Sequence, residues 1–247
     1  MMGRPLILSV FPGIDLLGRA FEEVWPEACL VRGPDLLWGG DVKTFHPPAG
    51  VFHGVIGGPP CQAHSQANVM GRLGRQALAE DLIPEFERVV AEAAPDWFLM
   101  ENVPPTQLPA VSGYVVRYAL VNNRAVGGVQ NRRRRFSFGS AWGGALDIEW
   151  VALEPAEYAP CVTANGAQWD SRSSRRARGL DERARSRSDR SVRMLTEYIR
   201  WQGLPDGFLA DAPFTVAEKV RVVGNGVPMA LGRAIARAVR RAVEGRA

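Results

Sequence analysis

The stretch that decides the fold is Leu6-Ile7-Leu8-Ser9-Val10-Phe11-Pro12-Gly13, near the start of the 247-residue chain. A short, mainly apolar run stopped by a Pro-Gly pair predicts a buried strand that ends in a turn. Apolar side chains then recur at helical spacing over residues 15–24, so a helix is expected to follow. Strand, turn and helix in this order are typical of the first unit of an α/β sheet.

The same alternation continues outward from this unit. Further strands are expected at residues 28–31, 55–57, 97–100, 114–121 and 135–139, with a helix over 82–93. This pattern predicts an α/β fold, a mostly parallel sheet with helices on both faces. Residues 140–190 break the rhythm and are rich in Pro, Ser and Arg, so a small irregular lobe is expected there. Apolar residues at four-residue spacing from Val227 to Val243 predict a final packed helix.

Composition excludes several classes of protein. A chain that is 46% hydrophobic and 23% charged is neither disordered nor fibrous. No apolar run is long enough to span a membrane. Three Cys and three His without a Cys-x-x-Cys motif argue against a disulfide framework and against a metal site. A reducing cytoplasm is the expected compartment.

The positive charge is carried almost entirely by arginine. Of the 30 Lys and Arg residues only Lys43 and Lys219 are lysines, and the formal net charge is +4. Arginine is concentrated at residues 132–135 and 172–190. Because the guanidinium fork binds phosphate in a bidentate way, a nucleic-acid partner is one interpretation. Arginine-rich codon usage is the other, and both can hold together.

Three unusual clusters follow expected strands, at residues 11–13, 59–62 and 101–104. Ligands of open parallel sheets bind beyond the carboxyl ends of the strands, so the clusters should meet at one edge. Cys61 follows two prolines and precedes polar residues, a rigid and partly exposed setting. That setting suits a nucleophile better than a buried small hydrophobe, which is the alternative.

Two charged groups should lie near this thiol. Glu101 closes an apolar strand and should be part-buried, either as a cap or salt-bridge carboxylate or as an acid kept partly protonated by desolvation. Gln130, Arg132 and Arg134 alternate along an expected strand and would therefore share one face. Three aligned polar groups indicate a binding role, with a solvated charge run as the alternative.

Taken in order, these segments resemble the motifs of the DNA cytosine-5 methyltransferases. Each match is weak alone, but the set runs in family order from residue 6 to about residue 240 and is specific. The matching segments are Phe11-Pro12-Gly13-Ile14, Gly40-Asp41-Val42, Gly58-Pro59-Pro60-Cys61-Gln62, Glu101-Asn102-Val103, Gln130-x-Arg132-x-Arg134, residues 197–205, and Gly224-Asn225-Gly226-Val227.

The resemblance implies a mechanism. Cys61 would add to carbon 6 of a flipped cytosine, and Glu101 would hydrogen-bond the exocyclic amine and ring nitrogen 3. Arg132 and Arg134 would hold the carbonyl oxygen of the base and a nearby phosphate. The cofactor would be S-adenosylmethionine, bound by Phe11, Gly13, Ile14, Asp35, Asp41, Val42, Pro60, Leu82, Asn225 and Val227. DNA would be bound by Gln62, Arg172, Arg175 and Arg176.

The chain departs from the family pattern in three places. Asp15-Leu16 stands where a Gly-Gly pair is usual, and Asp35 is the nearest carboxylate to the end of the second strand. Only about fifty residues replace the usual target-recognition domain. We therefore expect a catalytic domain over 1–139 and 191–247, and a reduced target-recognition lobe over 140–190.

These observations lead to one expected function and two alternatives. The expected enzyme is a monomer that methylates carbon 5 of cytosine in double-stranded DNA at a short site. It would act in the bacterial or phage-infected cytoplasm, at the nucleoid, within a restriction–modification or phage context. A tRNA cytosine-5 methyltransferase shares the motif set. The second alternative is a catalytically inactive regulator that binds nucleic acid. The presence of Cys61, Glu101 and Arg132 argues against it.

Overall fold

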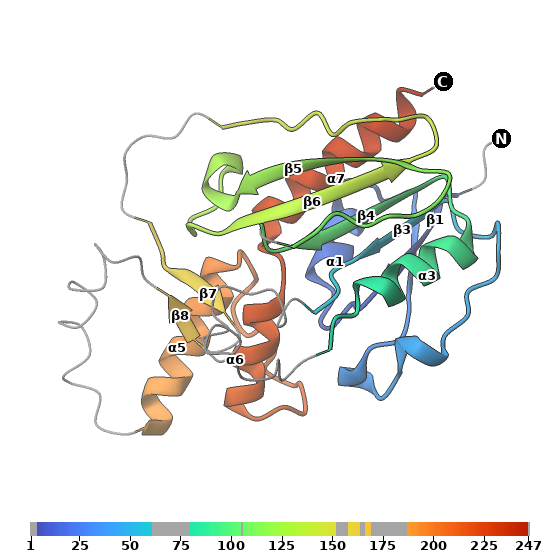
Figure 1. Ribbon diagram of the computed structural model, residues 1–247. Coiled ribbons are helices and arrows are strands. Elements are labelled where there is room, and N and C mark those ends of the chain that lie inside the picture. Colours follow the sequence, from blue (N-terminus) through green and yellow to red (C-terminus); the bar gives the residue numbers. More distant parts are fainter. Residues whose placement is uncertain are drawn as a thin grey trace, which may run out of the picture. The chain divides into compact units, whose positions relative to one another are not determined.

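The computed structural model describes residues 4–60, 80–104, 106–151, 158–163, 166–168 and 187–246 (Figure 1). The chain divides into two compact units. Unit 1 comprises Met1–Val121, Arg133–Glu149 and Arg233–Ala247. Unit 2 comprises Asn122–Arg132 and Trp150–Gly232.

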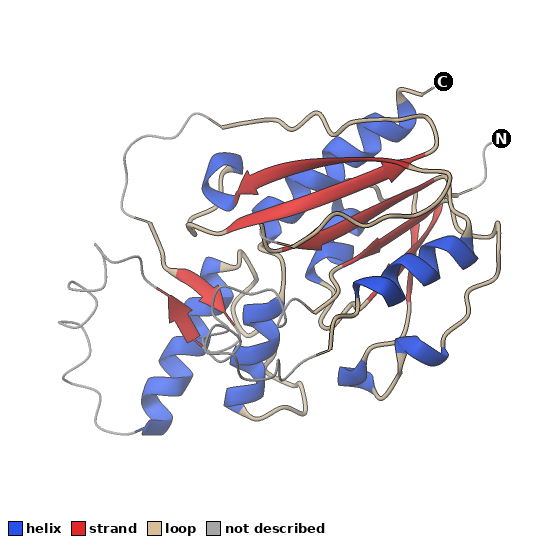
Figure 2. Cartoon of the chain, viewed as in Figure 1, coloured by secondary structure: helices blue, strands red, loops and turns tan. Residues whose placement is uncertain are grey.

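Unit 1 is built on a six-stranded sheet with the order β2-β1-β3-β4-β6-β5 (Figure 2). Strands β1 to β4 pair in parallel, and β6 runs antiparallel to β4. The predicted mostly parallel sheet is therefore confirmed. The strands are β1 (Leu6–Val10), β2 (Cys29–Arg32), β3 (Gly54–Gly57), β4 (Trp97–Asn102), β5 (Val115–Asn122) and β6 (Arg133–Ser140).

Helices cover both faces of this sheet, as the sequence predicts. Successive side chains of β4 point to opposite faces. Phe98 meets Phe86 of α3 (Ile83–Ala93) edge to face, whereas Trp97 stacks on Phe21 of α1 (Leu16–Val24). The final helix, α7 (Met229–Glu244), lies beside α1, where Arg240 donates to the carbonyl of Val24. Burial on both faces explains why the central strands are continuous apolar runs.

The turn between β1 and α1 depends on the first departure from the family pattern. Asp15 caps α1 by accepting a hydrogen bond from the amide of Gly18. Its carboxylate also accepts from the Ser9 hydroxyl at 2.9 Å and pairs with Arg32 at 2.8 Å. Burial raises the pKa of Asp15 above its ordinary value. A β-carbon at Gly18 would lie 2.3 Å from this carboxylate, so glycine there provides the space.

Unit 2 combines two helices and a small hairpin. They are α5 (Arg187–Trp201), α6 (Val216–Asn225), β7 (Cys161–Thr163) and β8 (Gly166–Gln168), the last two paired antiparallel. A capping box between Thr215 and Glu218 starts α6. Residues 191–232, expected in the catalytic domain, group with this unit. A target-recognition role for 140–190 stays a prediction, because 152–157, 164–165 and 169–186 lie outside the described residues.

One expected strand arrangement is wrong. Strand β6 begins at Arg133, so Gln130 and Arg132 precede it and do not share a strand face with Arg134. The amide of Arg132 donates to the carbonyl of Gln130 at 3.0 Å, a tight turn that an extended strand does not contain. The amide of Asn123 donates to the Arg132 carbonyl, which closes the loop between β5 and β6.

In the described part of the chain, no helix has the length and apolar character to cross a bilayer.

Candidate active site

Three strands of unit 1 end at the same edge. In register, Val10 of β1 lies beside Gly57 of β3, which lies beside Met100 of β4. The segments that follow these strands therefore begin side by side, as the parallel topology predicts. The described parts of all three clusters lie at this edge, namely residues 11–13, 59–60 and 101–104.

A charged pair forms the chemical centre of this edge. The guanidinium of Arg134 in β6 pairs with the carboxylate of Glu101 in β4 at 2.9 Å. Both side chains are largely buried, 15% and 13% exposed. A β-carbon built at Gly58 would lie 3.2 Å from the second carboxylate oxygen of Glu101. The carboxylate therefore lies against the backbone that leads directly into the Pro59-Pro60-Cys61 segment.

Asn102 fixes the same backbone, a role that sequence reasoning did not assign. Its buried side-chain amide donates to the carbonyl of Pro59, and its oxygen accepts from the amide of Val103 and the hydroxyl of Thr106. The loops after β3 and β4 are thus tied together. The sequence signal that could have identified this role is an asparagine directly after a predicted acid at the end of a predicted strand.

Several predicted site residues cannot be placed. The residues outside the described part of the chain are Cys61, Gln62 and the three arginines predicted to bind DNA, Arg172, Arg175 and Arg176. Their roles stay predictions.

The turn after β1 is held by the loop after β2. Phe11 and Gly13 both have positive φ, 56° and 53°, which reverses the chain tightly. The carboxylate of Asp35 accepts from the amide of Gly13 at 2.9 Å and from that of Leu37 at 2.8 Å. The indole of Trp38, 60% exposed, donates to the carbonyl of Gly13 at 2.8 Å. Asp35 therefore lies against the turn, and its cofactor role stays a prediction.

The Gly40-Asp41-Val42 segment is anchored to α3 by one arginine. Arg88 donates to the carbonyl of Val42 at 2.8 Å and to that of Phe45 at 3.0 Å. Asp41 caps the 3-10 turn η2 (Val42–Thr44) through the amide of Lys43. The other predicted cofactor residues of unit 1 belong to neighbouring loops: Ile14 before α1, Pro60 after β3 and Leu82 at the start of α3.

These groups fit a nucleoside cofactor in chemical type. Phe11 offers an aromatic ring, and Asp35 and Asp41 offer carboxylates that can accept from ribose hydroxyls or an exocyclic amine. A β-carbon at Gly13 would meet no atom within 4 Å, so the turn has free space beside it. Among the described residues, no cluster of His, Cys, Asp or Glu is placed to hold a metal ion.

Four predicted residues fall in unit 2: Gln130, Arg132, Asn225 and Val227. Arg132 is only 2% exposed, and its guanidinium donates to the carbonyls of Val162 and Gly226. Asn225 ends α6 with its side chain exposed, whereas Val227 is buried. Arg132 and Arg134, two residues apart in sequence, thus belong to different units.

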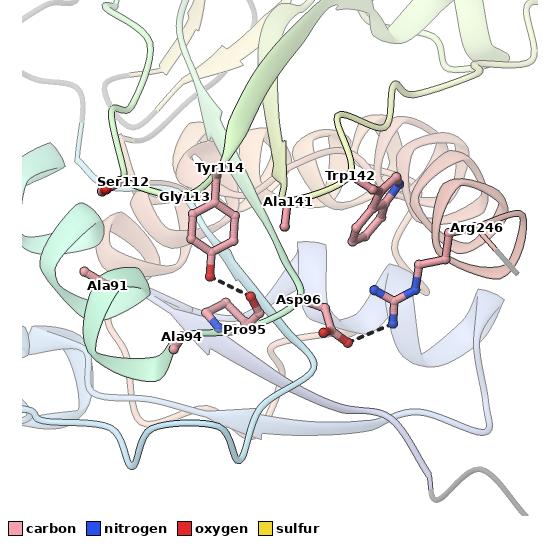
Figure 3. A pocket seen from close by; sticks show the side chains of 10 residues that line it. All are labelled: Ala91, Ala94, Pro95, Asp96, Ser112, Gly113, Tyr114, Ala141, Trp142 and Arg246. Carbon is pink, nitrogen blue, oxygen red and sulfur yellow. Dashed lines mark hydrogen bonds and ion pairs between the residues drawn. The ribbon is translucent and has the colours of Figure 1, made fainter.

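A pocket in unit 1 opens at the opposite edge of the sheet. It is bounded by residues just before β4 and just after β6, including Asp96 and Trp142 (Figure 3). Arg246 pairs with Asp96 at 2.8 Å and covers the Trp142 ring, and the hydroxyl of Tyr114 donates to the Pro95 carbonyl. None of the predicted site residues that the structure describes lines this pocket.

Solved structures of similar fold are methyltransferases. The chain superposes on DNMT2 of Spodoptera frugiperda with a TM-score of 0.56 and 11% identity, over 96% of this chain and 98% of that one. The methyltransferase EhMeth of Entamoeba histolytica gives a TM-score of 0.56 and 11% identity, over 99% of both chains. The fold is that of the Rossmann-like methyltransferases.

Sequence comparison narrows this class. Residues 40–146 match the model of the C-5 cytosine-specific DNA methylase family. The family resemblance that the ordered motifs predict is confirmed over this segment, which contains the Glu101–Arg134 pair.

Curated relatives are type II methyltransferases. M.HgiDI of Herpetosiphon aurantiacus is 31% identical over 118 residues, 43% of this chain and 35% of that protein. M.AquIA of Picosynechococcus is 53% identical over 49 residues, 20% of this chain and 19% of that protein. The matched part of the chain thus spans about a third or less of the length of these relatives.

Proposed function

We propose that the chain transfers a methyl group from S-adenosylmethionine to carbon 5 of cytosine in DNA, through a covalent Cys61 adduct and base flipping. The observation that carries this proposal is the Glu101–Arg134 pair. It lies against Gly58 at the carboxyl edge of the sheet, within the segment that matches the C-5 cytosine-specific DNA methylase family. A carboxylate at this place can act on a base presented to Cys61.

Cofactor binding is assigned to the loops at the same edge. Phe11 would pack on the adenine ring, Asp41 would accept from the adenine amine, and Asp35 would accept from the ribose. Each carboxylate oxygen of Asp35 already accepts one backbone amide but keeps a second lone pair for a hydroxyl. When bound, S-adenosylmethionine supplies an electrophilic methyl group on a sulfonium.

The residues of the chain overcome the low nucleophilicity of carbon 5. The Cys61 thiolate forms a bond to carbon 6, and the ring becomes an enamine whose carbon 5 can accept the methyl group. Glu101 hydrogen-bonds ring nitrogen 3 and the exocyclic amine, and favours the protonated ring on which addition is easiest. Arg134 orients the Glu101 carboxylate. Loss of the carbon 5 proton and cleavage of the bond to Cys61 release the product.

Base flipping follows from this chemistry. Attack on carbon 6 needs access above the ring plane, which stacking denies inside a duplex. The cytosine must therefore leave the helix before Cys61 can add.

Methylation assays on matched substrates test the function. The purified chain would be incubated with radiolabelled S-adenosylmethionine and either duplex DNA or tRNA, and modified DNA would be mapped by bisulfite sequencing. We expect 5-methylcytosine in DNA. Transfer to tRNA alone would establish an RNA cytosine methyltransferase instead. DNA binding without transfer to either substrate would establish an inactive binding protein.

Asp35 gives a test of the cofactor site. Asp35→Ala removes the acceptor of the Gly13 and Leu37 amides, whereas Asp35→Asn keeps one acceptor oxygen. We expect the dissociation constant of S-adenosylhomocysteine, measured by calorimetry without DNA, to rise by up to about tenfold with Ala, because the ribose loses one hydrogen bond worth roughly 1 kcal/mol and the Gly13 turn loses its support. The Asn variant should lie between Ala and wild type. Equal affinity in all three proteins would remove Asp35 from the cofactor site.

Specificity should be low because the segment available for base reading is short. Direct readout needs side chains held at a groove edge, and arginines suit phosphate better. We therefore propose a site of the target cytosine with about one or two neighbours. Substituting Arg175 and Arg176 by Ala together should weaken binding to all sequences alike. It should also reduce the slope of log affinity against log salt by about 2.

A matched pair of variants controls this prediction. Lysine at both positions keeps the charge and should keep most of the salt slope. Methylation mapping that returned a fixed site of about four or more base pairs would contradict the proposal, because such a site requires a dedicated reader.

A further inference from the structure

In unit 2, Arg132 is enclosed by backbone. The side chain is 2% exposed, and its guanidinium donates to the carbonyl of Val162 in β7 and, at 3.2 Å, to that of Gly226 after α6. A side chain that contacts a flipped base must present its donors to an open site. The two terminal nitrogens of Arg132 are instead directed at two segments of its own unit.

Two buried glutamines extend these contacts into a network. Gln130 donates to the carbonyl of Trp201 at 2.7 Å and to the side-chain oxygen of Gln202 at 2.9 Å, and accepts from the amide of Val162 at 3.0 Å. Gln202 donates to the carbonyls of Val223 and Gly226, at 2.6 and 3.1 Å. Both glutamines are at most 1% exposed. Buried, satisfied polar networks hold one backbone arrangement against others.

The network closes around the turn at residues 224–227. Gly226 accepts from both Arg132 and Gln202, and the amide of Met229 at the start of α7 donates to the Gln202 carbonyl at 2.9 Å. The turn is thus held at Gly226 and, two residues beyond its end, at Met229. Asn225 is left with an exposed side chain in a fixed backbone.

We infer that Arg132 is a positioning residue that sets the conformation of the 224–227 turn and thereby the affinity for the cofactor, and that it does not contact the flipped base. The inference rests on the proposed function, in which Asn225 and Val227 bind S-adenosylmethionine. It separates the two arginines of the Gln-x-Arg-x-Arg motif: Arg134 acts beside Glu101, and Arg132 acts through the turn.

Cofactor binding in the absence of DNA tests this inference. Arg132→Gln removes the donor pair that reaches Val162 and Gly226, and Arg132→Lys keeps one cationic donor. We expect Arg132→Gln to raise the dissociation constant of S-adenosylhomocysteine by about tenfold or more. The Lys variant should recover part of the loss. Arg134→Gln is the matched control and should bind S-adenosylhomocysteine as wild type does while its turnover falls.

Hydrogen exchange supplies a readout that does not depend on the ligand. Peptides covering residues 222–230 should exchange faster in Arg132→Gln than in wild type, and those covering β4 should not change. The inference would be overturned if Arg132→Gln lost turnover but kept the cofactor affinity and the hydrogen exchange of wild type. That result would indicate that Arg132 contacts the base. If wild type itself failed to bind S-adenosylhomocysteine, the proposed function would fail, and exchange at 222–230 would still decide the positioning role.

Discussion

Cys61→Ser is expected to abolish methyl transfer to DNA while leaving the affinity for S-adenosylhomocysteine nearly unchanged. A thiol forms a useful fraction of thiolate at neutral pH, whereas a serine hydroxyl does not and is a far weaker nucleophile toward carbon 6. The difference in size is small, so binding should survive. Radiolabel incorporation into DNA and calorimetry on the same preparations measure the two quantities.

Trapping provides the control. DNA containing 5-fluorocytosine should form a covalent complex with wild type that resists denaturation, because fluorine cannot leave as the carbon 5 proton does. The complex should be absent with Cys61→Ser. Cys29 is an exposed free thiol, so Cys29→Ser should trap DNA normally and exclude nonspecific alkylation. Substantial turnover by the Cys61 variant would rule out the covalent mechanism.

The edge that carries this chemistry could be predicted because its strands are buried on both faces. Val10, Val55 and Phe98 are fully buried and belong to continuous apolar runs, so periodicity and turn residues located the strands within one or two residues. Parallel topology then placed the segments after β1, β3 and β4 together without knowledge of any contact. Glu101 pairs with Arg134, and its predicted role as an acid stays a proposal.

Long-range partners account for what could not be predicted. Polar residues at alternate positions are typical of a strand, but Arg132 lies in a tight turn. Its guanidinium donates to Val162 and Gly226, which are 30 and 94 residues away in the sequence. Local pattern carries no information about such contacts. The same holds for Asp35, whose carboxylate accepts from Gly13, 22 residues earlier. Sequence identified it only as the nearest acid.

Glu101→Gln is expected to lower the single-turnover rate of methylation by about 10²–10⁴, the usual range for a general acid–base group. Glutamine keeps the shape and can accept a hydrogen bond, but it cannot give a proton to ring nitrogen 3. Rapid-quench measurement with saturating DNA and cofactor isolates the chemical step. Near-normal turnover would show that ring protonation does not limit the reaction or that Glu101 does not reach the base.

The substitution also removes the partner of Arg134, and a double-mutant cycle separates the two effects. Arg134→Gln breaks the 2.9 Å pair and leaves the carboxyl group in place. If Glu101 acts only by holding Arg134, the two single variants and the double variant should be equally slow. If Glu101 itself acts on the cytosine ring, the methylation rate of Glu101→Gln should be lower than that of Arg134→Gln. The rate of the double variant should then be equal to that of Glu101→Gln or only slightly lower. We expect the second pattern, because the Glu101 carboxylate lies against Gly58, three residues before the predicted nucleophile.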